Sequence, residues 1–279
     1  HDSLKISNGK WIWWSRGIGG RSALDYLIKV KGYSFLEAVE TIIGHTAIQA
    51  PVYEKPQSKE ENKPLLLPEK CASNRVITEY LFGRGIDFEI INYCISNDLI
   101  FESLPYHNVV FVGYDEKKEP KYAAYRSTNK RRIMGDCSGS KKDYSFRLGK
   151  ENLEEVHLFE CAIDLLSYAT LAKLNGQDWK EMSFVSLSGV YSPAKKIEDS
   201  KVPIALEKYL GSNPSVRKIR IHFDNDIAGR KAAQTLKTIL PDKYEIVDEP
   251  PKAGKDFNDF LCMRMGIYNK KTHERNEER

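Results

Sequence analysis

Two carboxylates spaced two residues apart follow directly on an apolar run. The run covers residues 219–223, and Asp224 and Asp226 come next, ahead of a small-residue turn and a helical pattern. Side chains two positions apart on an extended strand point to the same side, and two negative charges about 4 Å apart repel by about 4 kcal/mol at an effective dielectric constant of ~20. The pair therefore predicts a bound cation, and carboxylate oxygens favour Mg²⁺ or Mn²⁺ over zinc. The alternative is an acidic loop in which Asp226 caps the next helix.

Two further segments carry polar side chains at comparable places. Glu160 ends the apolar run 156–159 and precedes a predicted helix with an apolar face. A third segment, residues 254–259, contains Lys255, Asp256 and Asp259. In open parallel α/β sheets, ligand sites lie beyond the carboxyl ends of the strands, which is where Glu160 and the Asp224/Asp226 pair fall.

These residues resemble the Toprim domain shared by bacterial primases, topoisomerases and some nucleases. The matching motifs are Phe-Glu-Cys-Ala-Ile-Asp around Glu160, Asp-Asn-Asp-x-Ala-Gly from Asp224, and Lys-Asp-x-Asn-Asp from Lys255, and they span roughly residues 153–265. The resemblance implies an α/β fold, with a parallel sheet flanked by helices, over residues 151–267.

The resemblance also implies phosphoryl transfer at a phosphodiester or a nucleoside triphosphate, with Mg²⁺ or Mn²⁺ as cofactor. The candidate catalytic residues are Glu160, Asp224, Asp226 and Lys255. The candidate metal ligands are Glu160, Asp224, Asp226, Asp256 and Asp259. Glu160 is either a ligand or a general base, and Lys255 is a candidate for stabilising phosphate charge.

Each of these assignments has a structural alternative. Lys255 is alternatively an ordinary surface-loop lysine, and Asn258 alternatively caps a helix. His222 lies inside the predicted strand and is interpreted as a core histidine. Asp164 is interpreted as an acid in the first turn of a helix, where the helix dipole favours it.

The composition indicates an ordinary globular protein of about two domains, because 41% of its 279 residues are hydrophobic and 29% are charged. No run of 18 apolar residues is present, which predicts no membrane span and no membrane partner. No signal peptide is visible, and the five cysteines are scattered without a CxxC spacing. This pattern favours reduced thiols in a cytoplasmic protein and predicts no zinc in this chain.

Positive charge is concentrated between Lys117 and Lys150, where eleven Lys and Arg residues face three acids. Aromatic residues interleave with the charges, a pattern typical of a nucleic-acid track. The candidate contacts are Lys121, Arg126, Arg131, Arg132, Lys141, Lys142 and Arg147. A solvated β-hairpin face is the alternative interpretation.

Residues 1–48 are predicted to form a small unit with a strand at 11–14, a tight turn at 17–20, a helix at 23–30, and a second helix after Ser34, which makes a capping box with Glu37. The unit resembles the back half of the zinc-ribbon module that precedes bacterial primases. Trp13 and Arg16 stand where that family carries two zinc cysteines. We therefore expect a degenerate unit without zinc, with a packed tryptophan cluster in place of the metal; a base-stacking platform is the alternative.

The rest of the chain divides by composition. Residues 49–69 are polar and rich in proline, which predicts a linker. Residues 70–150 are predicted to form a basic α+β lobe with two helices and a hairpin. The lobe resembles the amino-terminal lobe of bacterial primases, which frames a groove for single-stranded template with the Toprim sheet. Residues 268–279 have no apolar face and are predicted to form a frayed tail.

Taken together, the sequence predicts a primase-like nucleotidyltransferase acting on single-stranded DNA. The family resemblance suggests service to replication or conjugative transfer of a mobile element, with nucleoside triphosphates, a helicase or a relaxosome protein as further partners. A Toprim nuclease is one alternative, and a non-catalytic nucleic-acid-binding module with a vestigial site is another. A topoisomerase is disfavoured because no catalytic tyrosine stands out among the fifteen.

Overall fold

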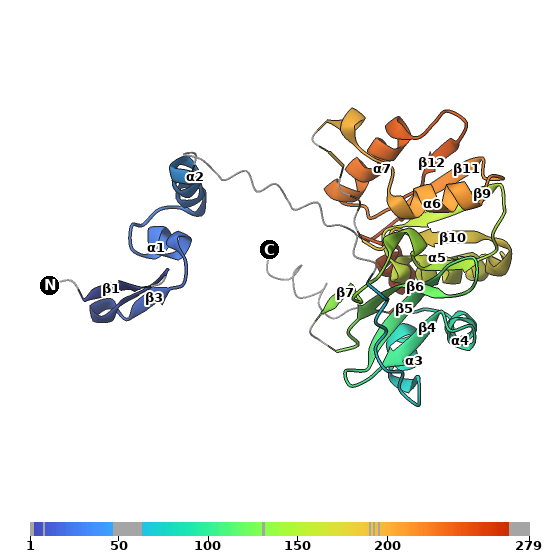
Figure 1. Ribbon diagram of the computed structural model, residues 1–279, viewed down its shortest axis with the longest axis horizontal. Coiled ribbons are helices and arrows are strands. Elements are labelled where there is room, and N and C mark those ends of the chain that lie inside the picture. The colour runs from blue at the N-terminus through green and yellow to red at the C-terminus, as the bar shows by residue number, and fades with distance from the viewer. Residues whose placement is uncertain are drawn as a thin grey trace. The chain divides into compact units, whose positions relative to one another are not determined.

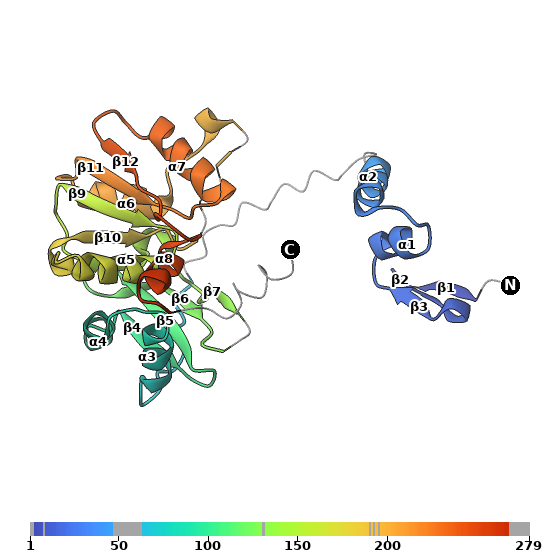
Figure 2. The same ribbon diagram turned by 180° about the vertical axis from the view of Figure 1, so that it is seen from behind.

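The computed structural model describes residues 3–7, 9–46, 63–129, 132–189, 191, 193–194 and 196–267. The chain divides into two compact units, residues 1–61 and residues 62–279, which are drawn in Figure 1 and, from behind, in Figure 2. The predicted tail, and the predicted linker up to residue 62, lie outside the described residues.

The amino-terminal unit is a three-stranded antiparallel sheet with two helices. Its elements are β1 (Leu4–Ser7), β2 (Lys10–Trp13), η1 (Trp14–Arg16), β3 (Ile18–Gly20), α1 (Ala23–Lys29) and α2 (Phe35–Thr46), with strand order β1-β2-β3. The capping box at the start of α2 is present, because the Ser34 amide donates to Glu37 (2.8 Å) and the Glu37 amide donates to the Ser34 hydroxyl (3.3 Å).

The predicted turn at 17–20 is largely a strand. Only Gly17 has a left-handed backbone (φ 63°), and β3 follows it at once. A side chain at Gly20 would stand 2.7 Å from the Trp11 indole nitrogen, so the glycine lets the strand pass close to this buried ring. The glycines therefore serve close packing as well as the turn.

The positions that lack the zinc cysteines are occupied by a stacked pair. The Arg16 guanidinium carbon lies 3.9 Å from the centre of the Trp13 ring, a cation–π geometry. Beside them, the buried Trp11 meets Tyr26 edge-on at 5.5 Å. Of the three tryptophans of this unit only Trp11 is buried, and Trp14 is 63% exposed, so the packed cluster and the relationship to a zinc ribbon both stay predictions.

The carboxy-terminal unit contains a five-stranded sheet of order β12-β11-β9-β10-β8. Its strands are β8 (Arg147–Gly149), β9 (Glu155–Phe159), β10 (Ser183–Ser186), β11 (Lys218–His222) and β12 (Glu245–Asp248). All pairs are parallel except that of β8 with β10. The helices around it are α5 (Ala162–Leu174), α6 (Ile204–Ser212), α7 (Ile227–Ile239) and α8 (Phe257–Arg264). The predicted α/β fold class, with a mostly parallel sheet flanked by helices, is confirmed.

Successive residues of the central strands feed two separate cores. Val156 and Leu158 of β9 pack in the core that includes α6 and α7, whereas Phe159 packs with α5 and α8. Figure 1 shows α6 and α7, and Figure 2 shows α8 beside α5. Because both faces are covered, the strand ends are the accessible part of this sheet.

The lobe is a four-stranded antiparallel sheet of order β4-β5-β6-β7 with two helices. Its elements are α3 (Arg75–Phe82), α4 (Phe88–Ser96), β4 (Ile100–Ser103), β5 (Asn108–Tyr114), β6 (Pro120–Arg126) and β7 (Met134–Asp136). Three short 3-10 turns complete the unit: η2 (Lys142–Tyr144), η3 (Trp179–Glu181) and η4 (Ile197–Asp199). The predicted helices and hairpin are present, whereas β4 and β7 were not predicted.

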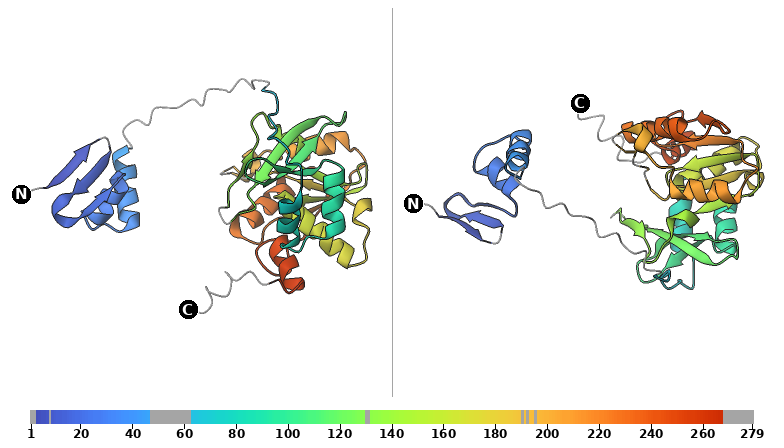
Figure 3. Two further views of the ribbon diagram at one scale, coloured as in Figure 1. Left: turned by 90° about the horizontal axis from the view of Figure 1, so that it is seen from below. Right: turned by 45° about the horizontal axis from the view of Figure 1, so that its top comes forward.

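The lobe and the five-stranded sheet share one hydrophobic core. Ile77 and Leu81 of α3 belong to the same buried cluster as Leu165 of α5 and Leu261 of α8. Figure 3 shows the lobe and the sheet as neighbouring parts of this unit. The strand β8 lies on the lobe side of the boundary predicted at residue 150, and yet it pairs with β10. The shared core holds the lobe in a defined place beside the sheet.

Gly113 offers a test of this packing. A methyl group there would stand 1.7 Å from the Tyr144 carbonyl oxygen, so Gly113→Ala should lower the free energy of unfolding by about 1–3 kcal/mol or more. Gly211 of α6 is the matched control, since nothing lies within 4 Å of the added methyl group and alanine favours a helix by up to about 1 kcal/mol. Urea unfolding of both variants measures the difference, and equal stabilities would contradict the close approach.

Candidate functional site

The first two acids meet at the carboxyl ends of neighbouring strands. Glu160 follows β9 and Asp224 follows β11 after Phe223, and these strands pair in parallel with Phe159 opposite His222. The Asp224 amide donates a hydrogen bond to Glu160 Oε1 at 3.1 Å. The sheet topology therefore brings together two side chains that are far apart in the sequence.

A lysine ammonium lies between the two aspartates. Lys255 Nζ is 3.3 Å from Asp224 Oδ2 and 3.4 Å from Asp226 Oδ2. The loop is held there by its backbone, because the Asn225 amide donates to the Lys255 carbonyl at 2.7 Å. The lysine supplies the positive charge that the paired carboxylates require.

Asp226 has two roles at once. Its Oδ1 accepts a hydrogen bond from the Gly229 amide at 2.9 Å and so caps α7, while its Oδ2 faces Lys255. A side chain at Gly229 would come within 2.2 Å of the Asp224 carbonyl oxygen and 2.9 Å of Glu160 Oε1. The glycine of the Asp-Asn-Asp-x-Ala-Gly motif is therefore required for the acids to converge.

Asp256 and Asp259 organise the loop that carries Lys255. Asp256 caps α8 by accepting from the Asp259 amide at 2.7 Å, and Asp259 accepts from the Lys255 amide at 3.3 Å. The cap of this helix is thus Asp256 and not Asn258, which is buried and donates to the Arg84 carbonyl and the Ser167 hydroxyl, both at 3.0 Å.

Asp164 is a further buried acid beside this cluster. It lies in the first turn of α5, as predicted, and accepts hydrogen bonds from the Asn258 amide (3.2 Å) and the Cys161 thiol (2.8 Å). Burial and the charge of Asp256 raise its pKa to about 7. The sequence analysis did not place it near the metal candidates, although its spacing of four from Glu160 on a helix start was a usable signal.

The acids of the cluster resist full ionisation. Burial, together with the charges of Asp224 and Asp226, raises the pKa of Glu160 to about 7. Burial and Asp256 also raise the pKa of Asp224, whereas the Gly229 amide lowers the pKa of Asp226. The cluster thus carries more negative charge than its single lysine balances, which favours a further cation.

A second cation anchors the end of β11. The Arg230 guanidinium donates to the carbonyl oxygens of Phe223 (2.8 Å) and Asp224 (3.2 Å) and pairs with Asp248 at 2.7 Å. It fixes the backbone from which the acids project. The sequence analysis missed this positioning residue, which lies one turn into the helix after the motif.

Several residues of the predicted basic track are neutralised within the lobe. Lys121 pairs with Glu119 (2.6 Å) and Asp115 (3.4 Å), and Lys142 pairs with Asp136 (3.1 Å). Arg147 lies 3.6 Å from Glu151 and stacks over the Tyr209 ring at 5.2 Å. The Lys121 and Lys142 pairs fit the solvated-face interpretation, whereas the Arg147 side chain is only 17% exposed and packs against Tyr209 of α6.

Other basic residues keep their charge uncompensated. Arg132 and Lys141 are exposed and pair with no acid in the described part of the chain, and Arg131 lies outside the described residues. Arg126 donates to the Tyr80 hydroxyl at 3.0 Å, and its charge opposes the burial-driven rise in the pKa of Cys161, the neighbour of Glu160. Arg126 therefore acts electrostatically on the residue next to Glu160.

Arg84 joins Arg126 at the same hydroxyl. Its Nη1 lies 3.5 Å from the Tyr80 oxygen, and its buried Nε has no hydrogen-bond partner among the described residues. Neither arginine pairs with a carboxylate in the described ranges. Arg84 was not among the residues selected from the sequence.

His222 is a core residue, as predicted from its place in the strand. It is 1% exposed, its Nε2 lies 2.8 Å from His157 Nδ1, and its Nδ1 donates to the Glu249 carbonyl at 3.0 Å. Burial lowers its pKa well below the usual 6.5. A neutral, fully bonded ring of this kind supports the sheet and leaves the chemistry to the acids.

Comparison with known proteins agrees with this geometry. Residues 157–261 match the family described as Toprim-like, and residues 79–152 match a family described as protein of unknown function (DUF3991). An uncharacterized protein of Bacillus anthracis is 26% identical over 300 aligned residues, which cover 95% of this chain and 80% of that protein. No helix among the described residues is long and apolar enough to span a membrane.

Solved primase structures are also similar. The primase fragment of the bacteriophage T7 primase-helicase protein is 15% identical with a TM-score of 0.46, over 94% of this chain and 89% of that one. The Aquifex aeolicus primase (zinc-binding and RNA polymerase domains) is 16% identical with a TM-score of 0.42, over 95% and 73%. The family match and the strand-end acids together identify the carboxy-terminal part of this chain, residues 157–261, as a Toprim-like domain.

Proposed function

We propose that the protein is a primase-like enzyme that acts on single-stranded DNA by metal-dependent nucleotidyl transfer. The observation that carries the proposal is that Glu160 and Asp224 follow the neighbouring strands β9 and β11 and are joined by a hydrogen bond, while the Lys255 ammonium bridges Asp224 and Asp226. A Toprim-like domain with this cluster supports chemistry on phosphate esters.

The donor set fits a hard divalent cation. Asp224 and Asp226 offer carboxylate oxygens, Glu160 stands beside them, and no sulfur or imidazole donor is part of the cluster. Mg²⁺ or Mn²⁺, when bound, would neutralise phosphate oxygens. Asp256 and Asp259 were predicted as ligands, but their hydrogen bonds at the start of α8 favour a role in holding the Lys255 loop.

The chain's own groups then divide the remaining work. Lys255, once released from the aspartates, is free to pair with a phosphate oxygen. Glu160, whose pKa is about 7, suits a general base that takes the proton of an attacking hydroxyl. Arg84 and Arg126, which share the Tyr80 hydroxyl and lack acidic partners in the described chain, suit phosphates of template or nucleotide.

The biological setting is inferred from the resemblance alone. It comprises replication or conjugative transfer of a mobile element in the cytoplasm, with nucleoside triphosphates as substrates and a helicase or relaxosome protein as partner.

One observation favours a second candidate function. Lys255 already bridges both aspartates, so the cluster has an internal cation that a non-catalytic, nucleic-acid-binding module with a vestigial site would also need. A Toprim nuclease would use the same acids. The primase-like enzyme, the nuclease and the non-catalytic module would share this site and are distinguished by the product that each forms or fails to form.

Primer synthesis distinguishes them. Wild-type protein with a single-stranded template, nucleoside triphosphates and Mg²⁺ or Mn²⁺ should give extended products, and Asp224→Asn should reduce the rate on the order of 10²-fold or more. Asp242→Asn, on an exposed loop, is the control and should retain activity. A shortened template would indicate the nuclease. If neither metal gives a product, the non-catalytic binding module is the candidate that the result supports.

The stability of the metal-free protein should depend on pH in a defined direction. The pKa of Glu160 is about 7 against an ordinary 4.5, so the folded chain holds a proton that the unfolded chain has lost. Without metal, the free energy of unfolding should therefore fall as the pH rises from about 4.5 to about 7. Asp164, with a pKa also raised to about 7, acts in the same direction.

Mg²⁺ favours the ionised acids, so its effect on the melting temperature should grow over the same pH range. Thermal unfolding with and without Mg²⁺ measures this for the wild type, for Glu160→Gln, which should flatten the pH dependence, and for Asp224→Asn, which should lose the Mg²⁺ effect. A Mg²⁺ effect that is equal in wild type and Asp224→Asn would contradict the assigned ligands.

DNA binding should separate two basic residues of one strand. Arg126 and Lys121 both lie on β6, but only Lys121 is neutralised by neighbouring acids. Arg126→Gln should weaken binding of labelled single-stranded DNA and reduce the slope of log affinity against log salt by about 0.7, whereas Lys121→Gln should change little. Fluorescence anisotropy at several salt concentrations measures the DNA affinity of both variants. Equal losses of affinity would support the alternative interpretation, a solvated charged face.

A further inference from the structure

The lobe brings together three potential metal ligands away from the carboxylate cluster. The donor atoms of Cys71, Glu102 and His107 lie within 4.8 Å of one another, and no other trio of His, Cys, Asp or Glu in the described ranges does so. The three residues come from different segments: the stretch before α3, the strand β4, and the turn after β4. Thiolate, carboxylate and imidazole are the donors that zinc takes in proteins.

Glu102 is the fixed member of the trio. It is 2% exposed, and its Oε2 accepts the amides of Val76 (2.9 Å) and Ile77 (3.2 Å) at the start of α3. Its other oxygen, Oε1, contacts His107 Nδ1 at 2.5 Å. One carboxylate oxygen is therefore anchored by a helix start, and the other is presented to the cluster.

Backbone bonds place the other two residues. The Cys71 amide donates to the Glu102 carbonyl at 2.8 Å, next to a β-bridge between Lys70 and Ser103. His107 has a left-handed backbone (φ 53°), and its amide donates to the Ser103 carbonyl at 2.8 Å. Cys71 is half-buried, and the His107 side chain is 46% exposed, which leaves a path for an ion and a water ligand.

The spacing of the donors suits a small tetrahedral ion. Zinc bonds of roughly 2.1 Å to nitrogen and oxygen and about 2.3 Å to sulfur place neighbouring donors about 3.4–3.6 Å apart. The histidine and glutamate would have to separate by about 1 Å, within reach of an exposed side chain. The alternative is a pair of His107 and Glu102 without a metal ion, in which His107 satisfies the buried carboxylate. Such a pair does not account for the thiol of Cys71 beside it.

We propose that Cys71, Glu102 and His107 bind one zinc ion, with water as the fourth ligand. Binding releases the Cys71 thiol proton to solvent, because the thiolate is the ligand. This site is independent of the carboxylate cluster, and it replaces the expectation that the chain holds no zinc.

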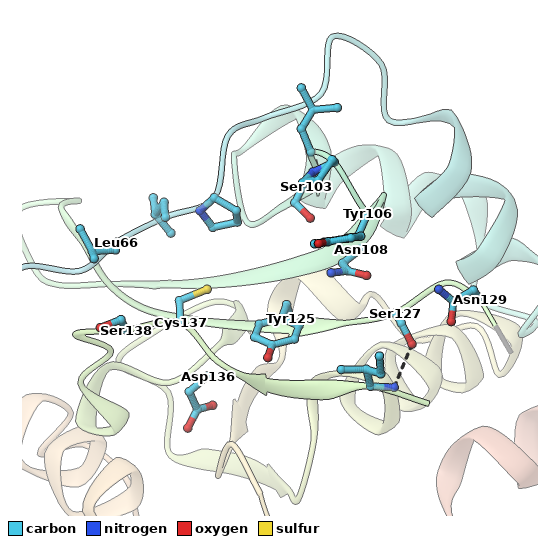
Figure 4. A pocket seen from close by; sticks show the side chains of 15 residues that line it. Leu66, Ser103, Tyr106, Asn108, Tyr125, Ser127, Asn129, Asp136, Cys137 and Ser138 are labelled. Atoms are coloured by element: carbon cyan, nitrogen blue, oxygen red, sulfur yellow. Dashed lines mark hydrogen bonds between the residues drawn. The ribbon is translucent and has the colours of Figure 1, made fainter. Parts of the chain in front are cut away.

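The ion would crosslink the segment at the start of the lobe to β4 and the turn that follows it. Residues 66–68, just before Cys71, line a groove of about 510 Å³ together with Ser103, Tyr106 and Asn108. Figure 4 shows Leu66 and these residues around the groove. A zinc ion joining Cys71 to the turn at His107 would hold both of these lining segments in place.

Zinc binding tests the site directly. The untagged full chain is titrated with Zn²⁺ against a chromophoric chelator, with excess Mg²⁺ present to occupy the carboxylate cluster. One equivalent should bind to the wild type, and this binding should be lost in Cys71→Ser and in His107→Gln. Cys137→Ser, a cysteine of the same lobe outside the trio, is the matched control and should retain it. Absence of stoichiometric binding, or equal binding by all four proteins, would overturn the proposal.

A second measurement begins with the wild type alone and so does not depend at that stage on any variant folding. Co²⁺ in place of Zn²⁺ should give the wild type a thiolate-to-cobalt charge-transfer absorption together with the visible bands of a tetrahedral site. Circular dichroism establishes whether Cys71→Ser is folded, and a folded Cys71→Ser protein should lack the charge-transfer band. A cobalt spectrum of oxygen ligands alone would overturn the assignment of Cys71.

Discussion

Repulsion among the carboxylates of Glu160, Asp224 and Asp226 is the constraint on which the site depends. Two of them project from the ends of adjacent parallel strands, so the sheet leaves them no freedom to separate. Burial raises the pKa of Glu160, and the charges of Asp224 and Asp226 add to that rise; burial and the charge of Asp256 raise the pKa of Asp224. Protonation, the ammonium of Lys255 and a divalent cation are three ways to relieve the same repulsion, and each excludes part of the others.

The surrounding structure holds the repelling carboxylates in place by fixing backbone atoms next to them. Arg230 holds the carbonyl oxygens at the end of β11, and Gly229 allows α7 to begin against Glu160. On the other side, Asn258 links the start of α8 to the lobe through the Arg84 carbonyl. The loop that carries Lys255 is thereby tied to the lobe that carries Arg126, so that acids and arginines belong to one rigid arrangement.

Much of the fold followed from local patterns, because an apolar strand that ends in an acid is a short-range signal. Such signals placed Glu160 and Asp224 at strand ends and predicted the capping box of Ser34 with Glu37, whereas the Toprim sheet was expected from the family resemblance and the suggested Asn258 cap was wrong. The short edge strands β7 and β8 carry too few residues for a periodicity. The pairing of Lys121 with Asp115 and Glu119 was also not predicted, although both acids are near in the sequence, because a count of charges does not express the geometry of the turn. Cys71, Glu102 and His107 share no spacing that would link them.

The two cations of the carboxylate cluster differ in how firmly they are held. Arg230 is mostly covered, at 28% side-chain exposure, and bonds to two carbonyls and a carboxylate, so removing it would leave buried acceptors unpaired. The Lys255 side chain is 58% exposed and makes two ion pairs longer than 3.2 Å, contacts that are typically worth about 0–1 kcal/mol. A vestigial site would be expected to replace the lost metal with a firmly held cation. A loosely held lysine beside a firmly held arginine instead leaves the aspartates exchangeable, which favours a site that still takes up a metal ion.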